Sequence, residues 1–253
     1  SNGSVLWSGK VTVNPGGRLD IQGHRELQSR GIVLWKPESK TTRFLIRNMR
    51  YYYDNSVGSE SFSTAYQVEA RPGSGQEVFA PYDATENVST LDLANVTDQK
   101  LDVEVNVYAE SGNLLKRTKL RLSPRATATV NLVSLFAGKK GLVSIKGSKS
   151  SSVIATVTQA IMDTDGSLKN AMAVIAREAL GSDLKGSYNT FLGQSCKLLL
   201  LNSEGKAVDY EVSMRGSNGV AALTGYKAQL PSKGTAELQL CEKAAGNTYG
   251  TIT

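Results

Sequence analysis

Residues 101–122 read LDVEVNVYAESGNLLKRTKLRL and predict an antiparallel β-hairpin. In the first half, Leu101 and three valines alternate with polar residues, which is the two-residue period of a strand with one face in water. ESGN at 110–113 has the composition of a turn. The second half alternates basic residues with Thr and Leu, so we expect Leu120 and Leu122 to face a core and the basic residues to face solvent.

The chain repeats itself with a period of about 107 residues. Leu91–Pro124 aligns without a gap with Leu198–Pro231, at an offset of 107 and with eight identical positions. Two further segments align at offsets of 106 and 110, Ser61–Tyr82 with Ser167–Tyr188 and GIVLWK from Gly31 with GLVSIK from Gly141. A unit of this length is too long for a solenoid repeat and fits an immunoglobulin-sized sandwich.

We therefore expect an all-β fold of tandem immunoglobulin-like β-sandwich domains with about seven strands per repeat. In this frame residues 1–85 form a partial sandwich, 86–184 a complete one and 185–253 a second partial one. The apolar core candidates of the complete unit, Leu91–Ala176, are Val103, Val105, Val107, Leu120, Leu122, Val130, Leu132, Val143, Ile145, Ile154 and Val157. Ile154 and Val157 point to opposite faces of a regular strand, so the two cannot both face one core without a bulge.

One segment can be interpreted in two ways. NAMAVIAREAL at Asn170–Leu180 favours a helix by residue propensity. Its counterpart from Thr64, TAYQVEARPG, has the residues of a strand, and equivalent positions of a repeat share a fold. We expect a strand, with a helix over Ala171–Leu180 as the alternative, and no helix elsewhere.

The third copy of the repeat is incomplete. It contains the early strands Cys196–Asn202, Val208–Met214 and Thr235–Leu240 but lacks the late ones. An open sheet edge is unstable alone, so the missing strands are expected from a longer chain, from Val5–Val13 or from a neighbouring molecule. The last source would produce head-to-tail self-association through incomplete terminal repeats. A different domain frame is the remaining explanation.

Composition excludes several classes of protein. The 253 residues are 40% hydrophobic and carry a net charge of +6, which excludes a disordered chain, and no apolar run is long enough to span a bilayer. A single His argues against a His-based triad or a multi-His metal site. No phosphate loop or dinucleotide fingerprint is present. We therefore predict no catalytic residue, no metal site and no cofactor.

Basic residues are concentrated between Ser111 and Met162, where nine Lys and Arg occur without an acidic residue. The binding candidates among them are Arg117, Lys119, Arg121, Lys139 and Lys140. The first three share one strand face and could contact an acidic glycan or an acidic protein. Specific nucleic-acid binding is not expected, because no stacking aromatic is interleaved. The alternative is a solvated face whose cations pair with Asp92, Asp102 and Glu104.

Tyr51, Tyr52 and Tyr53 form a second binding candidate. Alternation along a strand sends one or two of these rings away from a core, and tyrosine suits glycan and protein contacts because it is amphipathic. The alternative is that they are the core and edge tyrosines of an ordinary strand.

Cys196 and Cys241 are the two cysteines of the chain and form a candidate disulfide. An even number of cysteines fits an oxidising compartment, although two buried free thiols would also satisfy the sequence.

The sequence predicts a non-enzymatic secreted, periplasmic or cell-surface protein that acts as a structural, adhesive or partner-binding module. The composition and the tandem layout support this by fold-level analogy. The alternative is an accessory sandwich region of a glycan-active enzyme, or a module that binds polyanions or glycans.

Overall fold

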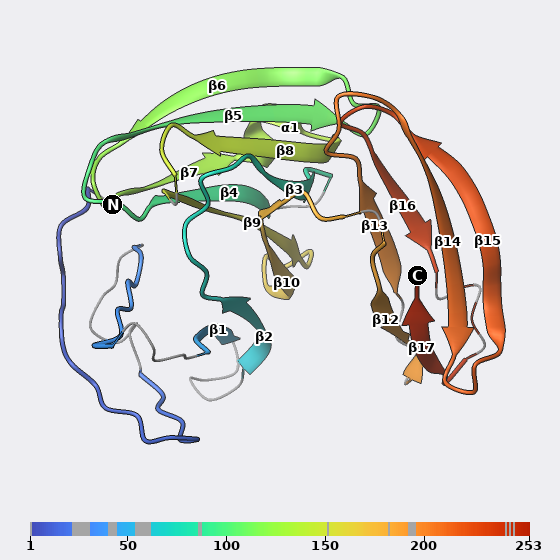
Figure 1. The fold of residues 1–253 in the computed structure, drawn as a ribbon, viewed down its shortest axis with the longest axis horizontal. Coiled ribbons are helices and arrows are strands. Elements are labelled where there is room, and N and C mark those ends of the chain that lie inside the picture. Colours follow the sequence, from blue (N-terminus) through green and yellow to red (C-terminus); the bar gives the residue numbers. More distant parts are fainter. Residues whose placement is uncertain are drawn as a thin grey trace.

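The structure is a computed structural model that describes residues 2–21, 31–39, 45–53, 62–85, 88–150, 152–181, 183–191, 196–240, 242, 244 and 246–253. Within these residues the chain forms seventeen strands and one five-residue helix. The strands assemble into several antiparallel sheets, which confirms the all-β prediction. Figure 1 shows two layered groups of strands, with the N-terminal segment beside the first group.

The first group is a sandwich of two sheets. One sheet has the strand order β11 (Arg177–Glu178), β3 (Val78–Asp83), β8 (Lys140–Gly147), β5 (Leu101–Ala109) and β6 (Leu114–Leu122). The other has the order β10 (Leu168–Ile175), β9 (Val153–Met162), β4 (Val88–Asn95) and β7 (Thr127–Asn131). Because β3 pairs with β8, strands on both sides of the boundary expected at residue 85 share this sandwich.

The hairpin β5–β6 has the register that its sequence predicts. Leu101 pairs with Leu122 and Val103 with Leu120, and these apolar side chains face the core between the sheets. Leu120 is half-buried and Leu122 is buried, whereas the basic residues of β6 are exposed. The prediction of which side of β6 faces solvent is therefore confirmed.

The predicted core is confirmed at every position except one. Strand β9 places Val153, Ala155 and Val157 in the core, and Ile154 lies on the opposite face, half-buried and outside the core cluster. The reason is the two-residue period of an unbroken strand. Ile154 was therefore wrongly assigned, and Val157 correctly.

The ambiguous segment is a strand over most of its length, since β10 covers Leu168–Ile175 and pairs with β9. The expectation of no helix was wrong, because α1 (Leu132–Phe136) follows β7 directly. Asn131 caps this helix: its side-chain oxygen accepts a hydrogen bond from the backbone N–H of Ser134 at 3.0 Å. Leu132 and Phe136 of α1 are buried against the core.

The second group of strands is smaller. One sheet has the order β12 (Gly186–Asn189), β17 (Tyr249–Ile252), β14 (Val208–Gly216) and β15 (Ala221–Leu230), and the other pairs β13 (Lys197–Leu201) with β16 (Thr235–Gln239). Tyr188, Val212, Met214 and Leu240 are the buried residues of its core. The three strands expected from the sequence are thus present. Within the described residues, no counterpart of β9 or β10 joins the two-stranded sheet.

The N-terminal part adds a separate hairpin of β1 (Arg47–Tyr53) and β2 (Phe62–Glu69). Tyr66 of β2 packs with Ala160 and Ala171 beside the first sandwich. No strand is assigned over 2–21 or 31–39, so neither Val5–Val13 nor GIVLWK forms one. The expectation that Val5–Val13 completes a sheet is therefore wrong for this structure.

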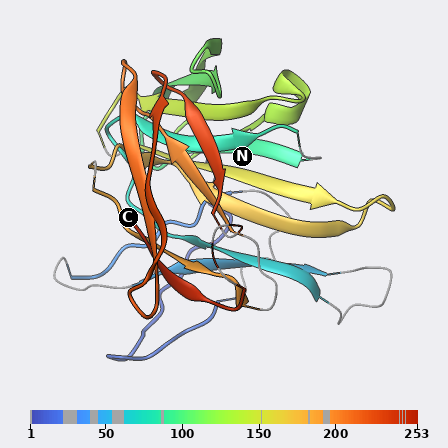
Figure 2. The ribbon, with the colours of Figure 1, turned by 90° about the vertical axis from the view of Figure 1, so that its right-hand side faces the viewer.

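Figure 2 shows that the strands of the two sandwiches run at a steep angle to each other. The tip of the β5–β6 hairpin lies at the end of the first sandwich that faces the second (Figure 1). The N-terminus lies near the opposite end.

Candidate binding surface

The outer face of β5 and β6 carries a ladder of two charged pairs and one Asn–Arg pair. Asp102 stands opposite Arg121, Glu104 opposite Lys119, and Asn106 opposite Arg117. We call these six residues the β5–β6 ladder. The Arg121 guanidinium donates two hydrogen bonds to the Asp102 carboxylate, at 2.7 and 3.2 Å.

Arg117 is held at the other end of the ladder. Its Nε donates a hydrogen bond to Asn106 Oδ1 at 3.0 Å and lies 3.7 Å from Glu104 Oε1. Lys119 makes no ion pair with the residues that the structure describes, although it faces Glu104 across the ladder. The ladder therefore combines three cations with two carboxylates, and one cation remains available to a ligand.

Within the ladder, the Asp102–Arg121 pair stays charged over a wide pH range. The hydrogen bond from Arg121 lowers the pKa of the Asp102 carboxyl and raises the pKa of the Arg121 guanidinium. Both groups are exposed, so the pair is screened by salt. The expected pairing with Asp102 and Glu104 is present. Asp92 takes no part in it, because it lies on β4 of the other sheet and accepts a hydrogen bond from Thr129 at 2.6 Å.

The opposite face of β6 borders a cleft of about 330 Å³ between β6 and the β7–α1 segment. Apolar side chains such as Val105, Leu120 and Phe136 line it together with five polar residues, namely Lys116, Thr118, Thr129, Asn131 and Ser134. Ladder and cleft thus share β6, the strand that supplies the basic residues.

Lys139 and Lys140 were predicted to join the basic surface, but Lys140 is engaged elsewhere. Lys140 Nζ lies 3.0 Å from Asp83 Oδ2 and 3.9 Å from Glu237 of the second sandwich. Burial acts to raise the pKa of Asp83, but hydrogen bonds from Thr85 and Lys140 outweigh it and lower that pKa. The bond to Asp83 raises the pKa of Lys140. Lys139 is exposed on the turn before β8.

The two sandwiches meet where a hairpin tip rests on a turn. The tip is the β5–β6 turn, residues 110–113, and the turn is Pro231–Gly234 between β15 and β16. The N–H of Thr235 donates to the carbonyl of Glu110 at 3.0 Å. Lys233 reaches from the turn to the first sandwich, where its Nζ lies 4.6 Å from the ring centroid of Phe79. We call this contact the joint.

A buried asparagine holds the turn of the second sandwich in place. The Asn202 side-chain NH₂ donates to the carbonyls of Lys206 and Pro231, both at 2.8 Å, and its oxygen accepts from the N–H of Glu204. These bonds tie the end of β13 to the turn that receives the hairpin tip.

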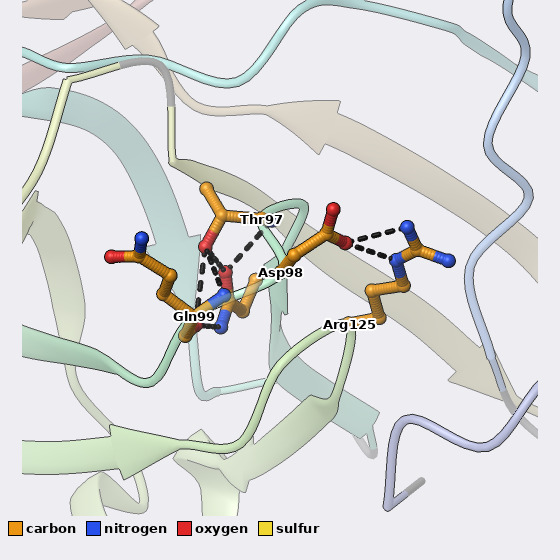
Figure 3. A network of polar contacts seen from close by, with 5 residues as sticks. Thr97, Asp98, Gln99 and Arg125 are labelled. Atoms are coloured by element: carbon orange, nitrogen blue, oxygen red, sulfur yellow. Dashed lines mark hydrogen bonds and ion pairs between the residues drawn. The ribbon is translucent and has the colours of Figure 1, made fainter.

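Asn95 has the same role in the first sandwich. It donates to the carbonyls of Gln99 and Ser123 at 2.7 and 2.9 Å, and accepts from the N–H of Thr97. Figure 3 shows Thr97, Asp98, Gln99 and Arg125 around this site, with Arg125 donating to the Asp98 carboxylate at 2.5 Å. The turn held here is Ser123–Ala126. Both asparagines lie in the aligned repeats, so the 107-residue offset alone could have identified them.

The other predicted site residues are only partly described. Tyr51, Tyr52 and Tyr53 lie in β1, but their side chains are outside the described part of the chain. Cys196 is not a free thiol. Its candidate partner Cys241 lies outside the described residues, so the disulfide itself stays a prediction. Within the described ranges no cluster of metal-ligating side chains is found, and no helix is long and apolar enough to cross a membrane.

A family model described as a family of unknown function (DUF5719) matches residues 70–251. The chain belongs to this family. The DUF5719 match runs from before β3 to β17, so it includes both sandwiches and the joint, and leaves the β1–β2 hairpin outside.

A search of curated proteins finds no match for this chain. Among solved structures, the chain is similar to one described as the crystal structure of Thermotoga maritima 1070, from Thermotoga maritima. The two share 13% sequence identity at a TM-score of 0.36, over 43% of this chain and 98% of that one.

Proposed function

We propose that this chain is a non-enzymatic binding and spacing segment of a secreted, periplasmic or cell-surface protein. In this proposal it consists of tandem immunoglobulin-like sandwiches, and it binds an acidic glycan or an acidic protein on the β5–β6 ladder. The observation that carries the proposal is the exposed ladder with its surplus cation.

Equivalent strand pairings support the tandem arrangement. The pairs β3–β8, β4–β7 and β5–β6 of the first sandwich have the counterparts β12–β17, β13–β16 and β14–β15 in the second. Asn95 and Asn202 each donate to the carbonyls four and 28 residues further along the chain, and each accepts from the N–H two residues on. The first sandwich adds β9, β10, β11 and α1 to this common set.

The position of the cations supports an anionic ligand. Arg117, Lys119 and Arg121 project from one exposed strand face, at the spacing of alternate residues. A linear polyanion can contact several such groups at once, and it can displace their carboxylate partners, the exposed Asp102 and the half-buried Glu104. The joint fixes the direction of this face relative to the second sandwich, as a spacer segment requires.

Cysteine chemistry supports a compartment outside the reducing cytosol. Cys196 packs against the second core, and a bridge to Cys241 would stabilise the smallest part of the molecule. Titration of thiols in the unfolded chain tests the bridge: no free thiol before reduction and two after it are expected. Two free thiols before reduction would contradict this compartment.

A sulfated glycan is the probe that tests the binding proposal. We expect heparin fragments to bind the native chain and to be released as salt rises. Replacing Arg117, Lys119 and Arg121 together by glutamine should weaken binding at least about tenfold. The matched control replaces the exposed Lys169, Lys185 and Lys206 by glutamine, which removes the same formal charge from other surfaces.

Equal weakening by the two triple variants would show a general charge effect and would contradict the ladder as the binding site. Shortened heparin fragments after incubation with the native chain would contradict the non-enzymatic proposal and favour a glycan-active enzyme. Calorimetric titration and analysis of fragment size make these two measurements.

A further inference from the structure

The joint depends on a glycine in a left-handed conformation. Gly112 at the β5–β6 tip has φ +82°, and a Cβ at this position would lie 1.9 Å from the carbonyl oxygen of Ser232. Any other residue would collide with this backbone atom. The joint therefore accepts a hairpin tip only if a glycine faces the carbonyl of the turn.

The second sandwich has a tip of the same construction. In the β5–β6 tip, the N–H of Gly112 donates to Ala109 O at 2.8 Å and the N–H of Ala109 to Asn113 O at 2.9 Å. In the β14–β15 tip, Gly219 donates to Gly216 O at 2.9 Å and Gly216 to Val220 O at 2.8 Å. Gly219 has φ +78°, and no described heavy atom lies within 4 Å of its Cβ position.

The first sandwich has a turn of the same construction as the one that receives Gly112. In Ser123–Ala126 the last N–H donates to the first carbonyl at 3.1 Å, and in Pro231–Gly234 the same bond measures 2.9 Å. Arg125 and Lys233 occupy the same place in these turns, with φ of 54° and 55°. The turn Ser123–Ala126 is therefore a second seat for a glycine tip.

This second seat is in contact with a glycine. Gly3 has φ +87°, and its Cβ position lies 1.9 Å from the carbonyl oxygen of Pro124, which is the equivalent of Ser232. The N-terminal segment thus makes the same close approach as the hairpin tip makes at the joint. In both seats the group bound to the turn is therefore a glycine with a positive φ, placed against the carbonyl oxygen of the turn.

We propose that the β14–β15 tip of one chain docks on the Ser123–Ala126 seat of a second copy of this chain, in the place of Gly3. The seat lies near the N-terminus, and the free tip lies at the far end of the second sandwich (Figure 1). Contact between these two different surfaces repeats in one direction and links copies head to tail. This route goes beyond the proposed ligand binding and requires no missing strand.

Single alanine substitutions at three glycines test the proposal, with the self-association constant from sedimentation velocity as the readout. Gly219→Ala places a Cβ against the seat and should weaken association at least about tenfold. Gly3→Ala expels the N-terminal segment and should strengthen association. The matched control is Gly166→Ala, since Gly166 is also an open hairpin glycine with φ +83°, and it should associate as the native chain does.

A native chain and a Gly3→Ala variant that both stay monomeric at millimolar concentration would overturn the proposal. Equal association by Gly219→Ala and Gly166→Ala would also overturn it, and would direct attention to strand addition at the edge of β13. Heparin binding is measured on each variant as well. Gly219 lies outside the β5–β6 ladder, so Gly219→Ala should weaken self-association and leave heparin binding unchanged, which tests the two proposals separately.

Discussion

The two sandwiches share a set of strands but bury their equivalent residues to different extents. Leu91 and Leu93 in β4 are fully buried, whereas the equivalent Leu198 and Leu200 in β13 are half-buried. The cause is the neighbouring strand: β4 lies between β9 and β7, and β13 pairs with β16 alone within the described residues. We therefore expect equivalent leucines of the two sandwiches to contribute different amounts to the free energy of unfolding.

The outer faces differ as well. In the first sandwich Arg121 stands opposite Asp102, and in the second Gln229 stands opposite Asp209 and donates a hydrogen bond to it at 2.9 Å. Glu211 and Lys227 form an ion pair on the second face, at 3.2 Å. The first ladder has one surplus cation and the second one surplus carboxylate, so we expect an anionic ligand to prefer the first.

The largest effect is expected from the core leucines. Leu91→Ala should cost about 3 kcal/mol of unfolding free energy in the first sandwich, because a fully buried side chain leaves a cavity. Leu198→Ala should cost about 1 kcal/mol in the second, since its side chain is already half in water. Urea unfolding followed through amide signals of each sandwich measures both, and equal costs would contradict the comparison.

Removal of the buried asparagines should have nearly equal effects in the two sandwiches. Asn95→Ala and Asn202→Ala each remove a buried side chain that makes several hydrogen bonds to the backbone, at a cost of about 2 kcal/mol. The same urea experiment measures both changes. A loss at one site and none at the other would show that the two turns are not held by the same interaction.

A smaller effect is expected at Tyr82, the buried tyrosine of β3. Its hydroxyl has no hydrogen-bond partner among the described residues, so Tyr82→Phe should stabilise the first sandwich by up to about 1 kcal/mol. No such unpaired hydroxyl is found at the equivalent Tyr188 in the described structure. We therefore expect Tyr188→Phe not to raise the free energy of unfolding. An increase as large as that of Tyr82→Phe would show that the two tyrosines do not differ in this way.

The same tyrosine has a pH signature. Burial, followed by the charges of Glu110 and Asp83, raises the pKa of Tyr82 from 10.0 to about 12. A raised pKa means stability that is fully present below pH 10 and lost as pH rises to about 12, by up to about 2 kcal/mol. Tyr82→Phe has no hydroxyl to ionise, so its stability advantage over the native chain should widen between pH 10 and about 12 in denaturation experiments if the hydroxyl is responsible.

The smallest effect is expected on the exposed ladders. Arg121→Gln should lower the unfolding midpoint only slightly, and Gln229→Arg should raise it slightly, because exposed ion pairs contribute little. Both changes should fade in high salt. A large, salt-independent change in either variant would mean that the ladder is a structural element and not a binding surface.

Periodicity predicted most of the first sandwich because its strands alternate cleanly. The register of β5–β6 followed from the placement of Leu120 and Leu122, and the ladder followed from the residues between them. Alternation could not locate α1, which depends on the cap at Asn131. Alternation also could not decide which of Ile154 and Val157 faces the core, since both are apolar. The structure decides it, because β9 is an unbroken strand with Val157 on its buried face.

The joint could not be predicted from the sequence. The 107-residue offset aligned Gly112 with Gly219 and Asn95 with Asn202, so the turns were recognisable as equivalent. The joint itself is a contact between the β5–β6 tip and the Pro231–Gly234 turn. It depends on the three-dimensional placement of Glu110 beside Thr235 and of Lys233 beside Phe79. No local pattern in the sequence encodes a contact between segments more than 100 residues apart.

We expect the hairpin tip seated on the turn to join the two sandwiches into one rigid body. Rotational correlation times from ¹⁵N relaxation test it most directly in the native chain, in Gly112→Ala and in the control Gly166→Ala. We expect one shared correlation time for both sandwiches in the native chain and in the control. Gly112→Ala, whose Cβ would meet Ser232, should give two different and shorter times. A single shared time in Gly112→Ala, equal to that of the native chain, would show that the joint does not hold the two sandwiches together.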